Sequence, residues 1–179
     1  LQGDVGSGKT AVAYLAALAA SSSGFQTAFM TPTELLSEQH ARTLVELGSG
    51  DPKALKIGLL TASMGRRDLG VVKDQLREGK IECIVGTQAL IQSDVQFKNL
   101  GLAIIDEQHR FGVRQQSALQ EKTIKARTPH TLVMTATPIP RSLALTAYGD
   151  LDLSVIDELP PGRIPVETRV IYPLERERA

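Results

Sequence analysis

The chain has 179 residues, 42% of them hydrophobic, which suits one domain with a substantial core and excludes a disordered chain. The 20 lysines and arginines balance 20 aspartates and glutamates, so no overall positive charge attracts nucleic acid, and such a partner would need a local patch or backbone N–H groups. No apolar run approaches the ~18 residues of a membrane span and no charged-then-apolar leader is present, so we expect a cytoplasmic protein with no membrane partner.

A phosphate-binding loop is predicted at the start of the chain, where residues 3–10 fit the pattern G-x-x-x-x-G-K-[ST]. Its three glycines allow consecutive backbone N–H groups to turn toward a phosphate. Lys9 would add positive charge beside the β- and γ-phosphates, and Thr10 would offer its hydroxyl to Mg²⁺. We therefore predict a nucleoside triphosphate substrate, held by Gly3, Asp4, Val5, Gly6, Ser7, Gly8, Lys9 and Thr10.

Helices and short apolar strands alternate after this loop, which predicts an α/β fold with a mostly parallel sheet and helices on both faces. Such a loop normally follows a strand, and only two residues precede it here, so we expect the domain to lack its first strand. Cys83 is the single cysteine and is predicted to be a buried core thiol. The predicted helices cover residues 9–20, 34–47, 69–77, 113–125 and 141–148, and the predicted strands cover 27–30, 56–60, 82–85, 102–105, 131–134 and 166–172.

Two adjacent carboxylates, Asp106 and Glu107, follow the predicted strand at residues 102–105. A phosphate loop supplies only positive charge and donors, so hydrolysis needs one carboxylate to help hold the metal and another to orient and deprotonate water. We assign Asp106 to Mg²⁺ and Glu107 to the water. Side chains of neighbouring strand residues point to opposite faces, so we expect the backbone to bend at the end of this strand.

The acidic pair belongs to a longer pattern. Residues 106–109, with Gln108 and His109 after the carboxylates, and the stretch Thr135, Ala136 and Thr137 resemble motifs II and III of superfamily two helicases, which share a RecA-like P-loop ATPase core. Residues 32–39 and 85–89 look like motifs Ia and Ib. The resemblance implies catalytic roles for Lys9, Asp106, Glu107, Gln108 and His109, DNA contacts by Pro32, Thr33, Gly86 and Thr87, and coupling of hydrolysis to DNA movement by Thr135, Ala136 and Thr137.

Several of these roles have simpler structural alternatives. Thr33 could act only as a helix cap, Thr87 could only form a turn, and His109 could be a structural histidine. We assign no chemistry to His40 or His130, which lie outside the motifs. No superfamily motif is found in residues 64–76, so Arg66 and Arg67 are interpreted as part of a solvated face.

Residues 104–113 and 134–163 resemble the RecG family of branch-migrating helicases. Gln108 favours RecG over the related Mfd family, which usually has a second glutamate at this position. Gln88 departs from the RecG pattern, because RecG-like chains usually carry a histidine there. The resemblance implies a helicase ATP-binding domain at residues 1–163, and at 164–179 the start of a connection to a second RecA-like domain. It also implies ATP and Mg²⁺ as cofactors and, as partners, branched DNA and a separate DNA-recognition domain.

Two alternatives remain open for the function. The first is a translocase domain of the Mfd or PriA type. The second is a chain that binds nucleotide and DNA without useful turnover, because superfamily two enzymes take their arginine finger from the second RecA-like domain. An arginine finger is worth roughly 10³ to 10⁵ in rate where it has been measured in GTPases.

Overall fold

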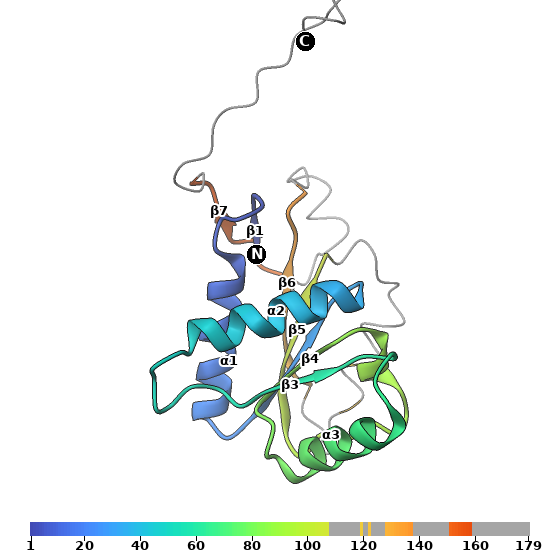
Figure 1. The fold of residues 1–179 in the computed structure, drawn as a ribbon. Coiled ribbons are helices and arrows are strands. Elements are labelled where there is room, and N and C mark those ends of the chain that lie inside the picture. Colours follow the sequence, from blue (N-terminus) through green and yellow to red (C-terminus); the bar gives the residue numbers. More distant parts are fainter. Residues whose placement is uncertain (108–118, 120–121, 123–127, 138–150, 159–179) are drawn as a thin grey trace, which may run out of the picture.

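The computed structural model describes residues 1–107, 119, 122, 128–137 and 151–158 (Figure 1). Most of the predicted helix at 113–125, the predicted helix at 141–148, the predicted strand at 166–172, and both Gln108 and His109 lie outside the described residues.

A parallel sheet of five strands forms the centre of the domain, with the strand order β3-β4-β2-β5-β6. All five strands were predicted, and each observed boundary lies within two residues of the prediction. Short apolar runs mark them because both faces of a parallel sheet are covered. The strands are β2 (Gln26–Met30), β3 (Ile57–Leu60), β4 (Cys83–Gly86), β5 (Leu100–Asp106) and β6 (His130–Met134).

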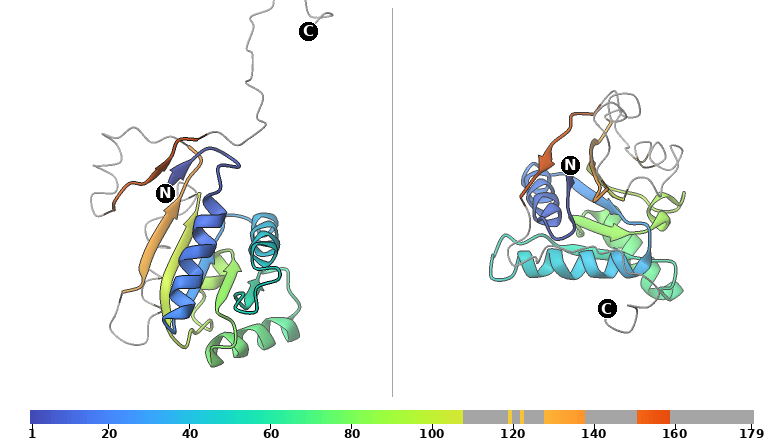
Figure 2. Two further views of the ribbon diagram at one scale, coloured as in Figure 1. Left: turned by 90° about the vertical axis from the view of Figure 1, so that its left-hand side faces the viewer. Right: turned by 90° about the horizontal axis from the view of Figure 1, so that it is seen from above.

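Helices cover both faces of the sheet, as predicted (Figure 2). α1 (Lys9–Ser22) and α2 (Glu34–Leu47) pack on the face that carries Phe29, whereas α3 (Arg66–Glu78) packs on the opposite face, which carries Ala28. Cys83 is fully buried on the α1 and α2 side, and burial raises the pKa of its thiol to about 12. The predicted buried cysteine is therefore confirmed.

The first residues of the helices agree with the prediction where the sequence carries a local signal for a helix start. Thr33 caps α2, because its hydroxyl accepts a hydrogen bond from the Leu36 backbone N–H at 3.3 Å, as the sequence predicted. α3 begins at Arg66, three residues earlier than predicted, because its first turn is polar and exposed and so gives no apolar periodicity. The exposure of Arg66 and Arg67 agrees with their predicted solvated face. A short 3₁₀ helix, η1 (Gln88–Ile91), was not predicted.

Two very short strands form a second, two-stranded sheet at the phosphate-loop side. β1 (Gln2–Gly3) pairs in parallel with β7 (Val155–Ile156). On its other side, the backbone of β1 is bonded to the end of β6, with Thr135 N donating to Leu1 O at 3.1 Å and Gly3 N donating to Thr135 O at 3.3 Å. β1 consists of only Gln2 and Gly3, the residue that begins the loop, and these long-range partners hold it in place.

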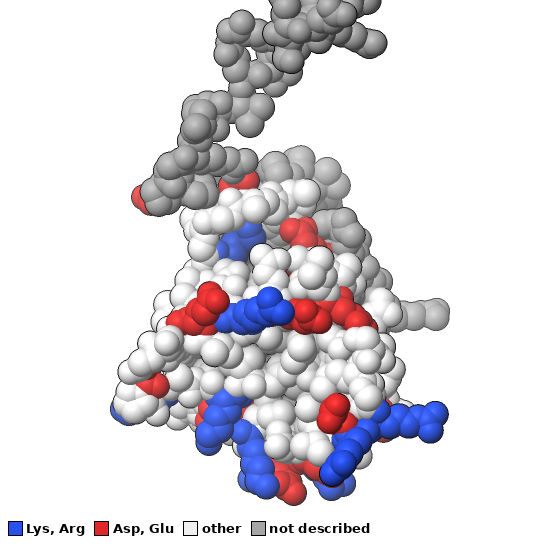
Figure 3. All heavy atoms as spheres, viewed as in Figure 1, with Lys and Arg blue, Asp and Glu red and all other residues white. Residues whose placement is uncertain are grey.

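The surface of the described residues mixes the two charges. α2 carries three glutamates and one arginine, Arg42, which lies 3.8 Å from Glu38, whereas Lys and Arg are more frequent near α3 (Figure 3). Within the described ranges, no helix is both long and apolar enough to cross a lipid bilayer.

Candidate nucleotide-binding site

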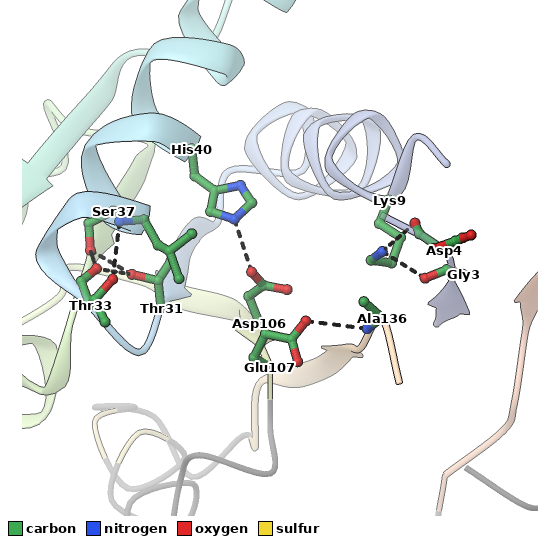
Figure 4. A network of polar contacts seen from close by, with 11 residues as sticks. Gly3, Asp4, Lys9, Thr31, Thr33, Ser37, His40, Asp106, Glu107 and Ala136 are labelled. Carbon is green, nitrogen blue, oxygen red and sulfur yellow. Dashed lines mark hydrogen bonds and ion pairs between the residues drawn. The ribbon is translucent and has the colours of Figure 1, made fainter. Parts of the chain in front are cut away.

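Four chain segments meet at the carboxyl edge of the sheet, where parallel α/β folds gather their functional residues. They are the loop after β1 with the start of α1, the turn after β2 with the first half of α2, the end of β5 and the turn after β6 (Figure 4). Together they enclose a cleft of about 670 Å³. It is lined by Val5, Gly6, Gly8, Lys9, Thr10, Pro32, Leu36, Gln39, His40, Asp106, Glu107, Met134, Ala136 and Thr137.

The loop after β1 has the backbone of a phosphate-binding loop. Gly6 and Gly8 have positive φ angles of 81° and 94°, which glycine adopts at little cost, and Gly8 directly precedes α1. Lys9 Nζ donates to the carbonyls of Gly3 and Asp4, both at 2.8 Å, so the ammonium group is held across the loop. The cationic group and the positive end of α1 therefore lie together at one side of the cleft.

The eight predicted nucleotide-binding residues divide into two groups. Val5, Gly6, Gly8, Lys9 and Thr10 line the cleft. Gly3, Asp4 and Ser7 do not line it but maintain the shape of the loop. A Cβ atom on Gly3 would stand 2.5 Å from Ser7 Oγ, and Ser7 N donates to Asp4 O at 3.1 Å.

Asp106 ends β5 on the opposite side of the cleft and is almost fully buried. Its Oδ2 lies 3.0 Å from Nε2 of His40, which projects from α2. The imidazole ring also packs against Phe29, with ring centroids 4.8 Å apart. No chemistry was assigned to His40 from the sequence, yet the fold brings its ring to the predicted metal ligand across 66 residues of sequence. The local sequence around His40 gives no signal for such a contact.

Glu107 follows Asp106 with a positive φ of 51°, rare for a residue with a Cβ atom. The expected bend at the end of β5 is therefore confirmed, and it brings both carboxylates to the cleft. Glu107 N donates to Met134 O at 3.0 Å, and Glu107 Oε1 accepts a hydrogen bond from Ala136 N at 3.3 Å. The predicted catalytic and coupling segments are thus in direct contact.

The coupling segment is itself ordered by hydroxyl groups. Thr135 Oγ1 and Thr137 Oγ1 are 2.9 Å apart, and Thr137 N donates to Thr135 Oγ1 at 3.2 Å. Thr135 is buried, whereas Thr137 is exposed and lines the cleft beside Ala136. A displacement of this turn would therefore reach Glu107 through Ala136 N.

The predicted DNA-contact residues lie at the same edge of the sheet, although only Pro32 lines the cleft. Thr33 is fixed by capping α2, and its carbonyl accepts hydrogen bonds from Thr31 Oγ1 at 3.0 Å and Ser37 Oγ at 3.2 Å. Next to it, hydrogen bonds from Ser63 lower the pKa of Glu34 and join the start of α2 to the loop after β3.

Gly86 is the last residue of β4 and Thr87 directly precedes η1, and neither residue lines the cleft. A Cβ atom on Gly86 would stand 2.4 Å from the backbone oxygen of Leu60 in β3, so the close approach of these strands requires glycine. The Thr87 side chain makes no capping hydrogen bond to η1. Its predicted contact with DNA stays a prediction.

Comparison with known proteins identifies the family. The model of the DEAD/DEAH box helicase family matches residues 1–146. The chain belongs to the DEAD/DEAH box helicase family. That match runs from the phosphate loop past the coupling segment, so it includes every residue of the cleft.

Individual relatives agree with the predicted resemblance to RecG. The chain is 56% identical over 178 residues to the ATP-dependent DNA helicase RecG of Thermotoga maritima, a match that covers 98% of this chain and 22% of the relative. It is 54% identical over 172 residues to the RecG of Escherichia coli strain K12, covering 96% of this chain and 24% of that protein. The chain thus spans about a quarter or less of the length of these relatives.

Solved structures similar to this chain are also helicases. A structure of RecG bound to a three-way DNA junction matches with a TM-score of 0.83 and 49% identity, over 99% of this chain and 23% of that chain. The helicase domain of Hef from Pyrococcus furiosus matches with a TM-score of 0.62 at 20% identity, over 86% of this chain and 33% of that one, and this likeness concerns the fold alone. The expected RecA-like helicase fold and the resemblance to RecG are therefore confirmed.

Proposed function

We propose that this chain is the first motor domain of a RecG-like ATP-dependent DNA helicase, which uses ATP hydrolysis to remodel branched DNA such as replication forks and Holliday junctions. The observation that carries the proposal is the convergence of Lys9, Thr10, Asp106 and Glu107 on one cleft. The similarity to RecG proteins supports the choice of DNA. Because this DNA lies in the bacterial cytoplasm, we propose a cytoplasmic location.

The cleft fits a nucleoside triphosphate with Mg²⁺. A backbone with two left-handed glycines allows close approach of phosphates, and Lys9 supplies the cation. Thr10 and Asp106 supply a hydroxyl and a carboxylate, the oxygen ligands that Mg²⁺ prefers. A bound Mg²⁺ ion would offset the negative charge that develops on the phosphate oxygens. Lys9 would thus bind the phosphates, and Thr10 and Asp106 would bind the metal ion that accompanies them.

Glu107 is the residue that we assign to proton transfer. Its carboxylate is held by Ala136 N through one oxygen, which fixes the position of the other. A carboxylate in such a fixed position can orient a water molecule and accept its proton. Because the same contact joins Glu107 to the segment of Thr135 and Thr137, movement of that segment would change the position of the base.

DNA would be held at the ends of β2 and β4 by local contacts rather than by a general positive field. Thr33 and Thr87, with the backbone around Pro32 and Gly86, are the proposed contacts with phosphate groups. α2 carries three glutamates and one arginine and so offers no positive field of its own, which favours this local mode of binding (Figure 3). We further propose that residues 1–163 form the ATP-binding domain and that a second RecA-like domain completes the site, with a separate domain recognising the branch.

A nucleotide titration tests the proposed site. With a fluorescent ATP analogue and Mg²⁺, Lys9→Ala should weaken binding by roughly 10- to 100-fold, since a hydrogen bond to a charged group is worth about 1.5 to 3 kcal/mol. Lys53→Ala, which removes an exposed lysine outside the cleft, is the matched control and should bind like the parent. If Lys9→Ala and the parent bound the nucleotide with equal affinity, the phosphate loop would not be part of the nucleotide site.

The helicase assignment needs the full-length protein. Its ATPase activity should rise more with forked DNA than with linear duplex of the same length, and forks should be remodelled only with hydrolysable ATP. Equal stimulation by both DNAs would favour an Mfd-like or PriA-like translocase. Tight ATP binding with no DNA-dependent turnover would leave only a nucleotide- and DNA-binding protein.

A further inference from the structure

His40 is the one histidine among the described residues that lines the cleft. It lies outside the phosphate loop, the acidic pair and the coupling segment, in the middle of α2. Its side chain is only 14% exposed, so it is not a solvated surface histidine. Its contact with Asp106 therefore calls for a functional explanation within the site.

The direction of the hydrogen bond follows from the two groups. An ionised carboxylate can only accept, so the proton of the contact belongs to Nε2 of His40. The bond uses Oδ2, and the second oxygen of Asp106 remains for a cation. Histidine that donates to a carboxylate ligand fixes its orientation in the way that outer partners of metal sites commonly do.

The position of His40 is itself well fixed. Ser37 and His40 are three residues apart, which places them on one face of α2, and Thr33 caps the start of this helix. Ser37 Oγ lies 2.6 Å from Thr31 Oγ1, which ties this face to the end of β2. The packing of the ring against Phe29 of β2 adds a second restraint. A histidine held in this way can restrict the orientation of the Asp106 carboxylate to which it donates a hydrogen bond.

We propose that His40 is a positioning residue for the metal-binding carboxylate: it holds Asp106 in the orientation that receives Mg²⁺ with the nucleotide. This inference rests on the proposed function, because it assumes that Asp106 serves a metal. Loss of an outer partner of this kind typically lowers metal affinity by roughly 10- to 100-fold. His40 would therefore affect the requirement for Mg²⁺ and leave the contact between the phosphate loop and the nucleotide intact.

Two substitutions separate the hydrogen bond from the packing of the ring. His40→Phe keeps a ring against Phe29 and removes the donor, whereas His40→Gln can place an amide N–H near the position of Nε2. In the full-length protein, binding of a fluorescent ATP analogue is measured against Mg²⁺ concentration and, separately, in EDTA. The Mg²⁺ midpoint should rise about 10-fold or more in His40→Phe and return toward the parent in His40→Gln. Binding in EDTA should stay unchanged in both.

Three outcomes bear on the inference in different ways. An unchanged Mg²⁺ midpoint in His40→Phe, or a His40→Gln variant as impaired as His40→Phe, would overturn it while the proposed ATP site stands. A parent protein that does not bind the nucleotide at all would overturn the proposed function as well. If His40→Phe loses binding in EDTA, the comparison of His40→Asn with His40→Gln replaces it. Only the longer glutamine amide reaches Asp106, so equal midpoints for these two would overturn the inference.

Discussion

Gln26 offers a sharp test of how the fold is held together below the cleft. The side chain is 5% exposed at the start of β2 and bonds four backbone groups. Its Nε2 donates to Leu76 O at 2.9 Å and Ile81 O at 2.7 Å, and its Oε1 accepts from Lys98 N at 2.8 Å and Asn99 N at 3.1 Å. One amide thus joins the end of α3 to the segments that lead into β4 and β5.

The substitution Gln26→Leu keeps a similar volume and removes all four hydrogen bonds. At about 1 kcal/mol for each bond, the loss would be about 4 kcal/mol. The residue borders an open pocket of about 300 Å³, so water can reach some of the freed backbone groups and reduce the loss. We therefore expect the free energy of unfolding to fall by about 2 to 4 kcal/mol.

Urea denaturation followed by circular dichroism measures this change. Gln75→Leu, on the exposed face of α3, is the matched control and should change stability by no more than about 0.5 kcal/mol. Nucleotide affinity under native conditions should be retained in Gln26→Leu, because Gln26 lies at the start of β2 and the cleft lies beyond its end. A loss below about 1 kcal/mol would refute the reasoning that these bonds are a main restraint on the sheet.

Further predictions concern catalysis and packing. Glu107→Gln should keep ATP binding, because its amide oxygen can still accept from Ala136 N, while turnover in the full-length protein falls by roughly 10²- to 10⁴-fold; unchanged turnover would exclude Glu107 as the base. Gly86→Ala should lower stability by about 1 to 3 kcal/mol in thermal melts, owing to the 2.4 Å approach to Leu60 O. Gly70→Ala in α3, where a Cβ meets nothing within 4 Å, should raise it by about 0.5 to 1 kcal/mol, and melts that rank the two glycines alike would contradict this. The Cys83 thiol, with its pKa raised to about 12, should react with a thiol reagent at pH 8 only after denaturant is added. ATPase assays of this chain alone, with and without fork DNA, should give roughly 10³-fold less turnover than the full-length protein, and a rate near that of the full-length protein would rule out the two-domain mechanism.

Most of the central sheet could be predicted because its strands carry their own signal. β4, most of β5 and residues 28–30 of β2 are short runs of apolar residues, and burial on both faces produces such runs. The cap at Thr33 could also be predicted, because threonine directly before a helix is a local pattern in the sequence. By contrast, β1 and β7 have two residues each and exist through pairing with each other and with the end of β6, so no local pattern could predict them.

In the candidate site, too, residues in contiguous sequence patterns could be predicted, whereas contacts between distant elements could not. The phosphate loop and the acidic pair are contiguous patterns, so the sequence identified Lys9 and Asp106 directly. His40 reaches Asp106 only because α2 crosses the end of β5, a relation between elements that are far apart in the chain. The bend at Glu107 was expected from the chemistry of two adjacent carboxylates, but its anchoring by Met134 O and Ala136 N depends on the register of β5 with β6.

The pairing of β1 with β7 has a mechanical consequence. Gln2 N donates to Ser154 O at 2.8 Å, and Gly3 lies opposite Ile156. Tension on the chain beyond Glu158 would therefore load the hydrogen bonds of this two-residue ribbon before it reached the rest of the sheet. Gly3 is also the first residue of the phosphate loop, and its carbonyl holds Lys9 Nζ. A pull of this kind would thus change the position of the lysine ammonium without passing through the hydrophobic core.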